Sequence, residues 1–222
     1  MSAGSTAAAS GASSSPLSSS SRGREPSERS AGSRRKPRAP LIVGLGGTER
    51  EGSVTEACLR EALLGAEHSG ARVELFSARA LELPMYNPTV DDRSQQALAL
   101  IEAIRECDGL VLGSPAYHGG LSGLVKNALD YLEDLHDDPR PYLDGRAVGC
   151  IVCAYGGQAT ATTLSSLRSI IHALRGWPTP LGVTVCSDSV LASDGTVTDE
   201  HVRSRLRIMG QQVLEFAQAR VI

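Results

Sequence analysis

Two segments of the chain combine glycines with side chains that can hold a ligand. The first segment, residues 46–55, reads Gly-Gly-Thr-Glu-Arg-Glu-Gly-Ser-Val-Thr and follows an apolar run that starts at Leu41. It carries three hydroxyls and one guanidinium, from Thr48, Arg50, Ser53 and Thr55. A helix is expected to begin near Ser53, so its unpaired N–H groups and positive dipole end would face the same place. This combination favours a bound phosphate dianion and requires no metal.

Ser53 also has a structural interpretation, which is compatible with phosphate binding. Ser53 can be the N-cap of the helix, with Glu56 three residues later as its capping-box partner, and it can do so while also touching a ligand. Two better-known phosphate motifs do not fit. Ser53 stands where a Walker A loop needs Lys, and Glu49 stands at the third glycine position of a dinucleotide fingerprint, so ATP and NAD sites of those types are disfavoured.

The second segment, residues 113–120, reads Gly-Ser-Pro-Ala-Tyr-His-Gly-Gly. Pro115 stiffens the expected loop, Tyr117 offers an aromatic face, and Gly119-Gly120 leave backbone N–H groups uncovered, which together suit a flat heterocycle. A third glycine pair, Gly156-Gly157, follows Tyr155 after the next strand. Glycine-rich loops are ordinary at strand ends of α/β proteins, so the third pair alone favours a structural role.

Apolar runs and helical periodicities alternate along the chain from residue 41. The expected strands are residues 41–45, 72–76, 109–113, 146–154 and 181–186, and the expected helices are 53–68, 94–107, 122–134, 163–174 and 198–219. This order predicts an α/β fold, a flavodoxin-like three-layer sandwich with a five-stranded parallel sheet in the order 2-1-3-4-5. The first two segments then meet at the switch point of the sheet, where such folds bind ligands.

Composition divides the chain at about residue 40. Residues 1–40 contain 13 Ser, and 7 Lys or Arg against 2 Glu, with almost no large apolar residue. Such a segment buries too little surface to offset its ordering entropy, so we expect a disordered Ser/Arg-rich tail followed by one domain at 41–222. The total charge of −3 leaves about −8 on the domain, which argues against nucleic acid as its partner.

The sequence also limits membrane, metal and disulfide chemistry. It has no 18-residue apolar stretch and no apolar core of a secretory signal near its start, so we expect a cytoplasmic protein without a membrane span. Five Cys disfavour a disulfide framework, and the scattered His residues have no chelating spacing, so no metal site is expected. Cys150 and Cys153 lie three apart on an expected strand and should face opposite sides of the sheet.

Two motifs, taken together, resemble the NADPH-dependent FMN reductase family over roughly residues 40–190. They are Thr-x-Arg-x-Gly-Ser-x-Thr at 48–55 and Gly-Ser-Pro-x-Tyr-x-Gly-x-x-x-Gly-x-x-Lys-Asn-Ala-Leu-Asp at 113–130. The resemblance implies FMN phosphate contacts from Thr48, Arg50, Ser53 and Thr55, and ring contacts from Pro115, Ala116, Tyr117, His118 and Gly119, with Tyr155, Gly156 and Gly157 nearby. It also implies a homodimer or homotetramer whose partner helps to close the site. We expect Lys126 and Asn127 of the second motif to be structural.

The resemblance implies an FMN-dependent oxidoreductase, with hydride passing from NADPH or NADH to FMN. Electrons then reach a quinone, azo or metal acceptor, or leave as reduced FMN for a partner monooxygenase. One alternative is an FMN-dependent dehydrogenase of a small metabolite, such as 2-amino-4-deoxychorismate in natural-product (secondary) metabolism. Its candidate catalytic base is His118, which stands where Asn is common in the family and can exchange a proton near neutral pH. His118 can instead act only as a hydrogen-bond donor to the flavin, which is the interpretation we favour. A flavodoxin-type electron carrier is a further alternative, which Arg50 in the phosphate segment disfavours.

Overall fold

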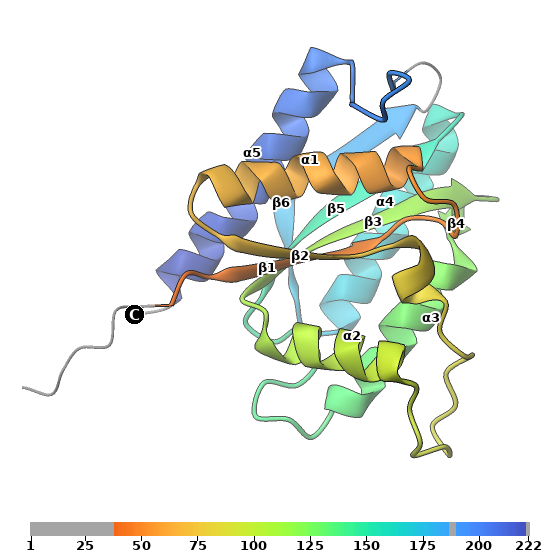
Figure 1. The fold of residues 1–222 in the computed structure, drawn as a ribbon, viewed down its shortest axis with the longest axis vertical. Coiled ribbons are helices and arrows are strands. Elements are labelled where there is room, and N and C mark those ends of the chain that lie inside the picture. The colour runs from red at the N-terminus through yellow and green to blue at the C-terminus, as the bar shows by residue number, and fades with distance from the viewer. Residues whose placement is uncertain (1–37, 187–189, 221–222) are drawn as a thin grey trace, which may run out of the picture. The chain divides into compact units, whose positions relative to one another are not determined.

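The computed structural model describes residues 38–186 and 190–220 (Figure 1). The tail predicted at 1–40 lies almost wholly outside these ranges and stays a prediction. Five parallel strands, β1 (Leu41–Gly46), β2 (Arg72–Phe76), β3 (Gly109–Tyr117), β5 (Ala147–Ala154) and β6 (Trp177–Cys186), lie in the order β2-β1-β3-β5-β6. This confirms the predicted fold and strand order. A sixth, two-residue strand, β4 (Gly120–Leu121), pairs antiparallel with β3 and was not expected.

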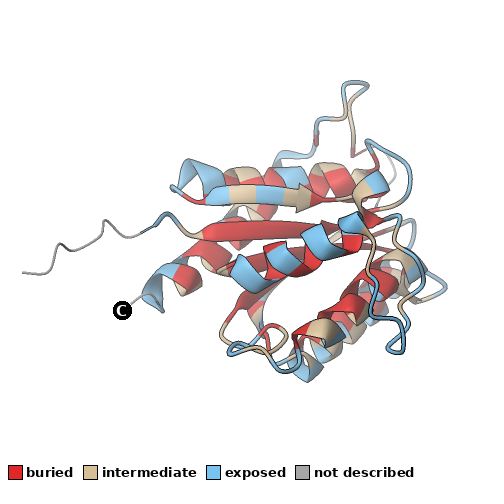
Figure 2. Ribbon diagram, turned by 60° about the horizontal axis from the view of Figure 1, so that its bottom comes forward, coloured by how far each residue is buried: buried red, intermediate tan, exposed pale blue. Residues whose placement is uncertain are grey.

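Helices cover both faces of the sheet. Helices α1 (Val54–His68) and α5 (Glu200–Ala219) pack on one face, and α2 (Gln95–Glu106), α3 (Gly123–Asp130) and α4 (Gly157–Ala173) on the other. Two short 3₁₀ helices, Ala78–Leu81 and Tyr131–Leu135, extend the connections. Figure 2 shows the buried central strands between helices whose outer sides are exposed.

The strands explain why the core divides in two. Every residue of β1 is buried, as expected of a parallel strand covered on both faces. Because successive side chains of a strand point to opposite faces, Val43 and Leu45 join the core under α2 and α3, whereas Ile42 joins the core under α1 and α5. The continuous apolar runs of the sequence therefore supply both cores at once.

Three predicted boundaries are wrong, each for a physical reason. The strand expected at 109–113 continues to Tyr117, because Ser114 and Pro115 still pair with β5 and Tyr117 pairs with β4. The helix expected from residue 163 begins at Gly157, in a stretch of small polar residues that carries no apolar periodicity. The strand expected from residue 181 begins at Trp177, although Pro178 and Pro180 interrupt it, because it is the edge strand of the sheet.

Asn127 of α3 fastens the long connection that precedes α2. Its side chain is only 8% exposed and accepts a hydrogen bond from Tyr86 N–H at 2.8 Å, while its amide donates to the carbonyls of Leu83 (3.3 Å) and Pro84 (2.9 Å). The structural interpretation of Asn127 is therefore confirmed.

A second clamp holds the far end of the same connection. The guanidinium of Arg93 makes two hydrogen bonds of 2.7 Å to the Asp134 carboxylate and lies 4.8 Å from the centre of the Tyr86 ring. These contacts hold the pKa of Asp134 below its ordinary value, the hydrogen bond from Arg93 being the largest cause. The connection is therefore anchored to α3 and the 3₁₀ helix that follows it.

Replacing Asn127 by Ala should destabilise the fold by about 2–3 kcal/mol, because buried partners lose their hydrogen bonds. Lys126→Ala is the matched control: its side chain is half-exposed and, among the described residues, pairs with Asp130 alone, so the change should cost less than about 0.5 kcal/mol. Urea unfolding of both variants measures the difference. Equal midpoints for Asn127→Ala and wild type would contradict the clamp.

Candidate functional site

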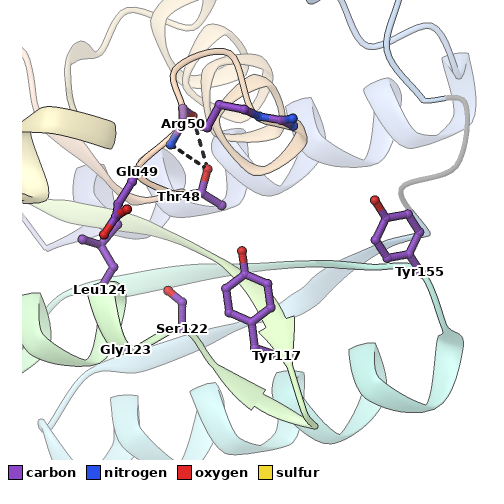
Figure 3. A pocket seen from close by; sticks show the side chains of 8 residues that line it. All are labelled: Thr48, Glu49, Arg50, Tyr117, Ser122, Gly123, Leu124 and Tyr155. Carbon is purple, nitrogen blue, oxygen red and sulfur yellow. Dashed lines mark hydrogen bonds between the residues drawn. The ribbon is translucent and has the colours of Figure 1, made fainter.

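The first and second segments meet at the carboxyl ends of β1 and β3 and line two adjoining spaces. The wide cleft, of about 700 Å³, is lined by Thr48, Glu49, Arg50, Tyr117, Ser122, Gly123, Leu124 and Tyr155 (Figure 3). The narrow hollow, of about 220 Å³, is lined by Thr48, Arg50, Ser53, Val54, Thr55, Pro115, Ala116, Tyr117, Cys153, Ala154 and Tyr155. Four residues belong to both spaces, so they adjoin: Thr48, Arg50, Tyr117 and Tyr155.

Glycines allow the first segment to leave β1 against the end of β3. Gly46 and Gly47 have φ angles of +136° and +113°, which favour glycine. A Cβ at Gly46 would lie 1.8 Å from the carbonyl oxygen of Gly113, whereas the N–H of Gly47 donates to that oxygen at 3.2 Å. The backbones of the two segments thus touch directly, and this contact sets how the first segment leaves β1 beside the end of β3.

The narrow hollow has the donors that a phosphate group needs. Ser53 and Thr55 are buried in the first turn of α1, and Arg50 is exposed and forms no ion pair within the described residues. Thr48 accepts a hydrogen bond from Arg50 N–H at 3.2 Å, which shapes the turn. The guanidinium, the hydroxyls and the positive end of α1 together fit a dianion.

The capping box forms in a modified way. The Ser53 hydroxyl accepts from Glu56 N–H at 3.2 Å, so the predicted N-cap is confirmed. The Glu56 carboxylate accepts from Gly52 N–H at 3.1 Å, one residue before the usual partner, and from Arg60 at 2.6 Å. The acidic side chain is thereby paired, and it does not line the narrow hollow.

The wide cleft suits a flat ring. Tyr117 is 56% exposed and Tyr155 is 83% exposed, and both present aromatic rings to the cleft in Figure 3. At the start of α3, Ser122 caps the helix by accepting from Val125 N–H at 3.2 Å, and its own N–H donates to the buried Ser114 hydroxyl at 3.0 Å. That bond ties the start of α3 to the end of β3, so the wall of the cleft is rigid.

His118 and Gly119 form the two-residue turn between β3 and β4. Their φ angles of +53° and +83° are those of a type I′ hairpin turn, in which both central residues are left-handed. They line a third space, the side hollow, of about 520 Å³, together with Gly156, Gln158, Ala159 and Thr162. The sequence expected His118 and Gly119 to face the same ligand as Tyr117. In the structure they lie outside the lining of the wide cleft and the narrow hollow, because the hairpin reverses the chain immediately after Tyr117, and their contact with a ligand stays a prediction.

The remaining predicted residues divide between the spaces. Eight of them line the wide cleft or the narrow hollow: Thr48, Arg50, Ser53, Thr55, Pro115, Ala116, Tyr117 and Tyr155. Gly156 is the N-cap of α4 and Gly157 is its first residue. Sequence reasoning missed Glu49, Ser122, Leu124 and Cys153. Glu49 lies between two predicted residues and could have been found by its position, whereas Cys153 was noted only as half of a Cys-x-x-Cys, which gave no sign that it lies at this site.

Two further properties concern the described residues alone. Between residues 38 and 220, with 187–189 left aside, no group of three or more His, Cys, Asp or Glu side chains could hold a metal ion. In the same part of the chain, every helix is too short or too polar to cross a membrane.

Comparisons with known proteins point to one family. The family model described as NADPH-dependent FMN reductase matches residues 40–191. The FMN-dependent NADPH-azoreductase of Staphylococcus aureus is 34% identical over 132 residues, which are 58% of this chain and 66% of that protein. The chain thus spans just under two thirds of the length of the curated relatives it matches.

Solved structures share the fold. FerB, a flavoenzyme NAD(P)H:(acceptor) oxidoreductase from Paracoccus denitrificans, superposes with a TM-score of 0.67 at 19% identity, over 82% of this chain and 98% of that one. RosB, solved with bound 8-demethyl-8-formylriboflavin-5'-phosphate, gives 0.66 at 18% identity, over 82% of this chain and 80% of that one. At these identities the likeness establishes the fold.

Gly46→Ala should destabilise the fold by about 3 kcal/mol or more, because the new methyl group overlaps the Gly113 carbonyl. Gly52→Ala is the control: Gly52 also has a positive φ, +67°, but open space around it, so only the backbone cost of about 1–2 kcal/mol applies. Thermal and urea unfolding compare the two. Equal losses would show that the Gly46–Gly113 contact is not the constraint described above.

Proposed function

The chain belongs to the NADPH-dependent FMN reductase family, and on this premise we propose that it is an FMN-dependent oxidoreductase that takes hydride from NADPH or NADH. One observation carries the proposal: the two segments line a narrow hollow suited to a phosphate and an adjoining wide cleft suited to a flat ring. When bound, FMN would accept a hydride and pass two electrons on to an acceptor.

The chain itself binds and orients. In this proposal Arg50, Thr48, Ser53 and Thr55 hold the phosphate in the narrow hollow, where the positive end of α1 adds to the attraction. Tyr117 holds the ring from one side in the wide cleft, and Pro115 and Ala116, which continue β3 along the narrow hollow, support it. The cofactor is thus anchored through its charged phosphate, at the end far from its ring. The ring end stays open to a second substrate.

We propose an azo, quinone or similar flat acceptor for the electrons. The name of the Staphylococcus aureus relative, an FMN-dependent NADPH-azoreductase, supports both the donor and the acceptor class. The exposure of Tyr155 and Tyr117 supports a flat acceptor that stacks on aromatic rings. Release of reduced FMN to a partner monooxygenase remains the competing route in this proposal.

A second copy of the chain is also part of the proposal. Tyr155, which lines the wide cleft, and Met85, in the connection that precedes α2, are more than 80% exposed, which is costly for large apolar side chains. A homodimer or homotetramer that covers them would exclude water from the ring. Light scattering at several protein concentrations, with and without FMN, tests this part separately.

The central experiment follows the flavin spectrum. The full chain is purified, loaded with FMN, made anaerobic and mixed with NADPH, with NADH, or with candidate metabolites. We expect rapid loss of the oxidised flavin band with a nicotinamide donor. Bleaching by a metabolite such as 2-amino-4-deoxychorismate, and not by NADPH or NADH, would replace the proposed reductase by a metabolite dehydrogenase.

Arg50→Ala should weaken FMN binding by about 1.5–3 kcal/mol, or about 10- to 150-fold in Kd, because a charged hydrogen bond to the phosphate is lost. Riboflavin, which has no phosphate, should bind nearly as before. Arg72→Ala, an exposed arginine at the start of β2, is the control and should change neither affinity. Fluorescence titration of both flavins measures the effect, and equal losses for the two would show that Arg50 does not bind the phosphate.

His118→Asn should preserve reduction by NADPH within a few-fold. Asn tolerates the left-handed conformation of the turn, so the hairpin should be retained, and His118 does not line the wide cleft. Stopped-flow reduction between about pH 5.5 and 8.5 checks this. A loss of about 10²- to 10⁴-fold confined to metabolite oxidation would instead identify His118 as a catalytic base.

A further inference from the structure

Two buried thiols from distant parts of the chain meet beneath the narrow hollow. The sheet separates the two cysteines of the Cys-x-x-Cys motif, as the sequence predicted: Cys150 lies in the core under α4, and Cys153 in the core under α1. Cys58 of α1 is the neighbour of Cys153 in this core, and each thiol shifts the pKa of the other. Both are free thiols, Cys58 fully buried and Cys153 4% exposed.

Cys153 belongs to the wall of the narrow hollow. It lines that hollow together with Ser53, Thr55 and Pro115, and Pro115 is its partner in the pairing of β3 with β5. Thr55 is also a neighbour of the Cys153 thiol and contributes to lowering its pKa. A chemical change at Cys153 therefore acts directly on two of the side chains proposed to bind phosphate.

The narrow hollow makes Cys153 the more accessible of the two thiols, because Cys153 lines it and Cys58 is fully buried. The neighbouring Cys58 thiol, and then the Thr55 hydroxyl, lower the pKa of Cys153 against the opposing effect of burial. The positive end of α1 lies at the same hollow, and it favours a thiolate as it favours a phosphate. The hollow also gives a small oxidant a route to Cys153, which Cys58 lacks.

We propose that Cys153 and Cys58 form a peroxide-sensitive pair that closes to a disulfide and thereby weakens phosphate binding in the narrow hollow. The Cys153 sulfur attacks hydrogen peroxide, forming a sulfenic acid and releasing one water. The Cys58 sulfur then attacks the sulfenic sulfur, the S–S bond forms, and a second water leaves. In sum, two thiols are oxidised and one hydrogen peroxide is reduced to two waters.

The disulfide changes the binding site through the first turns of α1. It draws Cys58 and Cys153 together and removes the thiol that neighbours Thr55, so Thr55 and Ser53 shift from their positions in the hollow. Because coupling between two events at one site is reciprocal, a bound phosphate should also slow the oxidation. The part of the proposal that concerns FMN rests on the proposed function, whereas the disulfide itself does not.

The first test measures the disulfide alone. The full chain carrying Cys186→Ser, which removes the exposed thiol, is treated with hydrogen peroxide, denatured and alkylated, and its peptides are mapped by mass spectrometry. We expect a Cys58–Cys153 cross-link that dithiothreitol reverses. In Cys58→Ala, dimedone should trap a sulfenic acid at Cys153, whereas in Cys153→Ala position 58 should stay reduced. Absence of the cross-link in the folded parent protein would overturn the proposal.

The second test measures the effect of the disulfide on FMN binding. Oxidised protein should bind FMN about tenfold more weakly than reduced protein, and riboflavin with little change, as expected when a hydrogen bond to a charged phosphate is lost. Cys150→Ala, on the other face of the sheet, is the matched control and should keep the response. A cross-link that forms but leaves FMN affinity unchanged would overturn the regulatory part. Failure of reduced protein to bind FMN at all would instead refute the proposed function, while the cross-link result stands.

Discussion

The close approach of Gly46 to Gly113 is the constraint on which the site depends. A side chain on Gly46 would overlap the Gly113 carbonyl, and the next N–H along the chain donates to that oxygen. The contact joins the ends of β1 and β3, which are neighbours in the sheet, and it brings two segments more than sixty residues apart to one cleft. The hydroxyls of one segment and the aromatic ring of the other can then serve a single ligand.

The narrow hollow combines the positive end of α1 with a buried thiol. The helix's field and its unpaired N–H groups favour an anion, and Cys153 lies in the wall of the same hollow. The proposed ligand binding and the proposed thiol chemistry therefore share one hollow. They share it because β5, which carries Cys153, lies directly beside β3.

Rigid supports hold the opposite wall. Ser122 joins the start of α3 to Ser114 at the end of β3, and Asn127 one turn later fastens the connection that runs from Leu83 to Tyr86. Arg93 and Asp134 close the other end of that connection. Helix α3 therefore both lines the wide cleft and resists displacement by a bound ring.

The sequence alone determined the parallel sheet and its strand order, and it placed a glycine- and hydroxyl-rich segment at the end of β1. Each follows from local patterns, namely apolar runs buried on both faces, and glycines and hydroxyls at fixed spacing. Only the tertiary structure decided the continuation of β3 into a hairpin, which depends on pairing with β5 and β4 and turns His118 toward a separate hollow. It alone also decided the meeting of Cys58 with Cys153. Contacts between residues so far apart in the chain cannot be predicted from the spacing of residues in the sequence, because they arise only when a helix packs onto a strand.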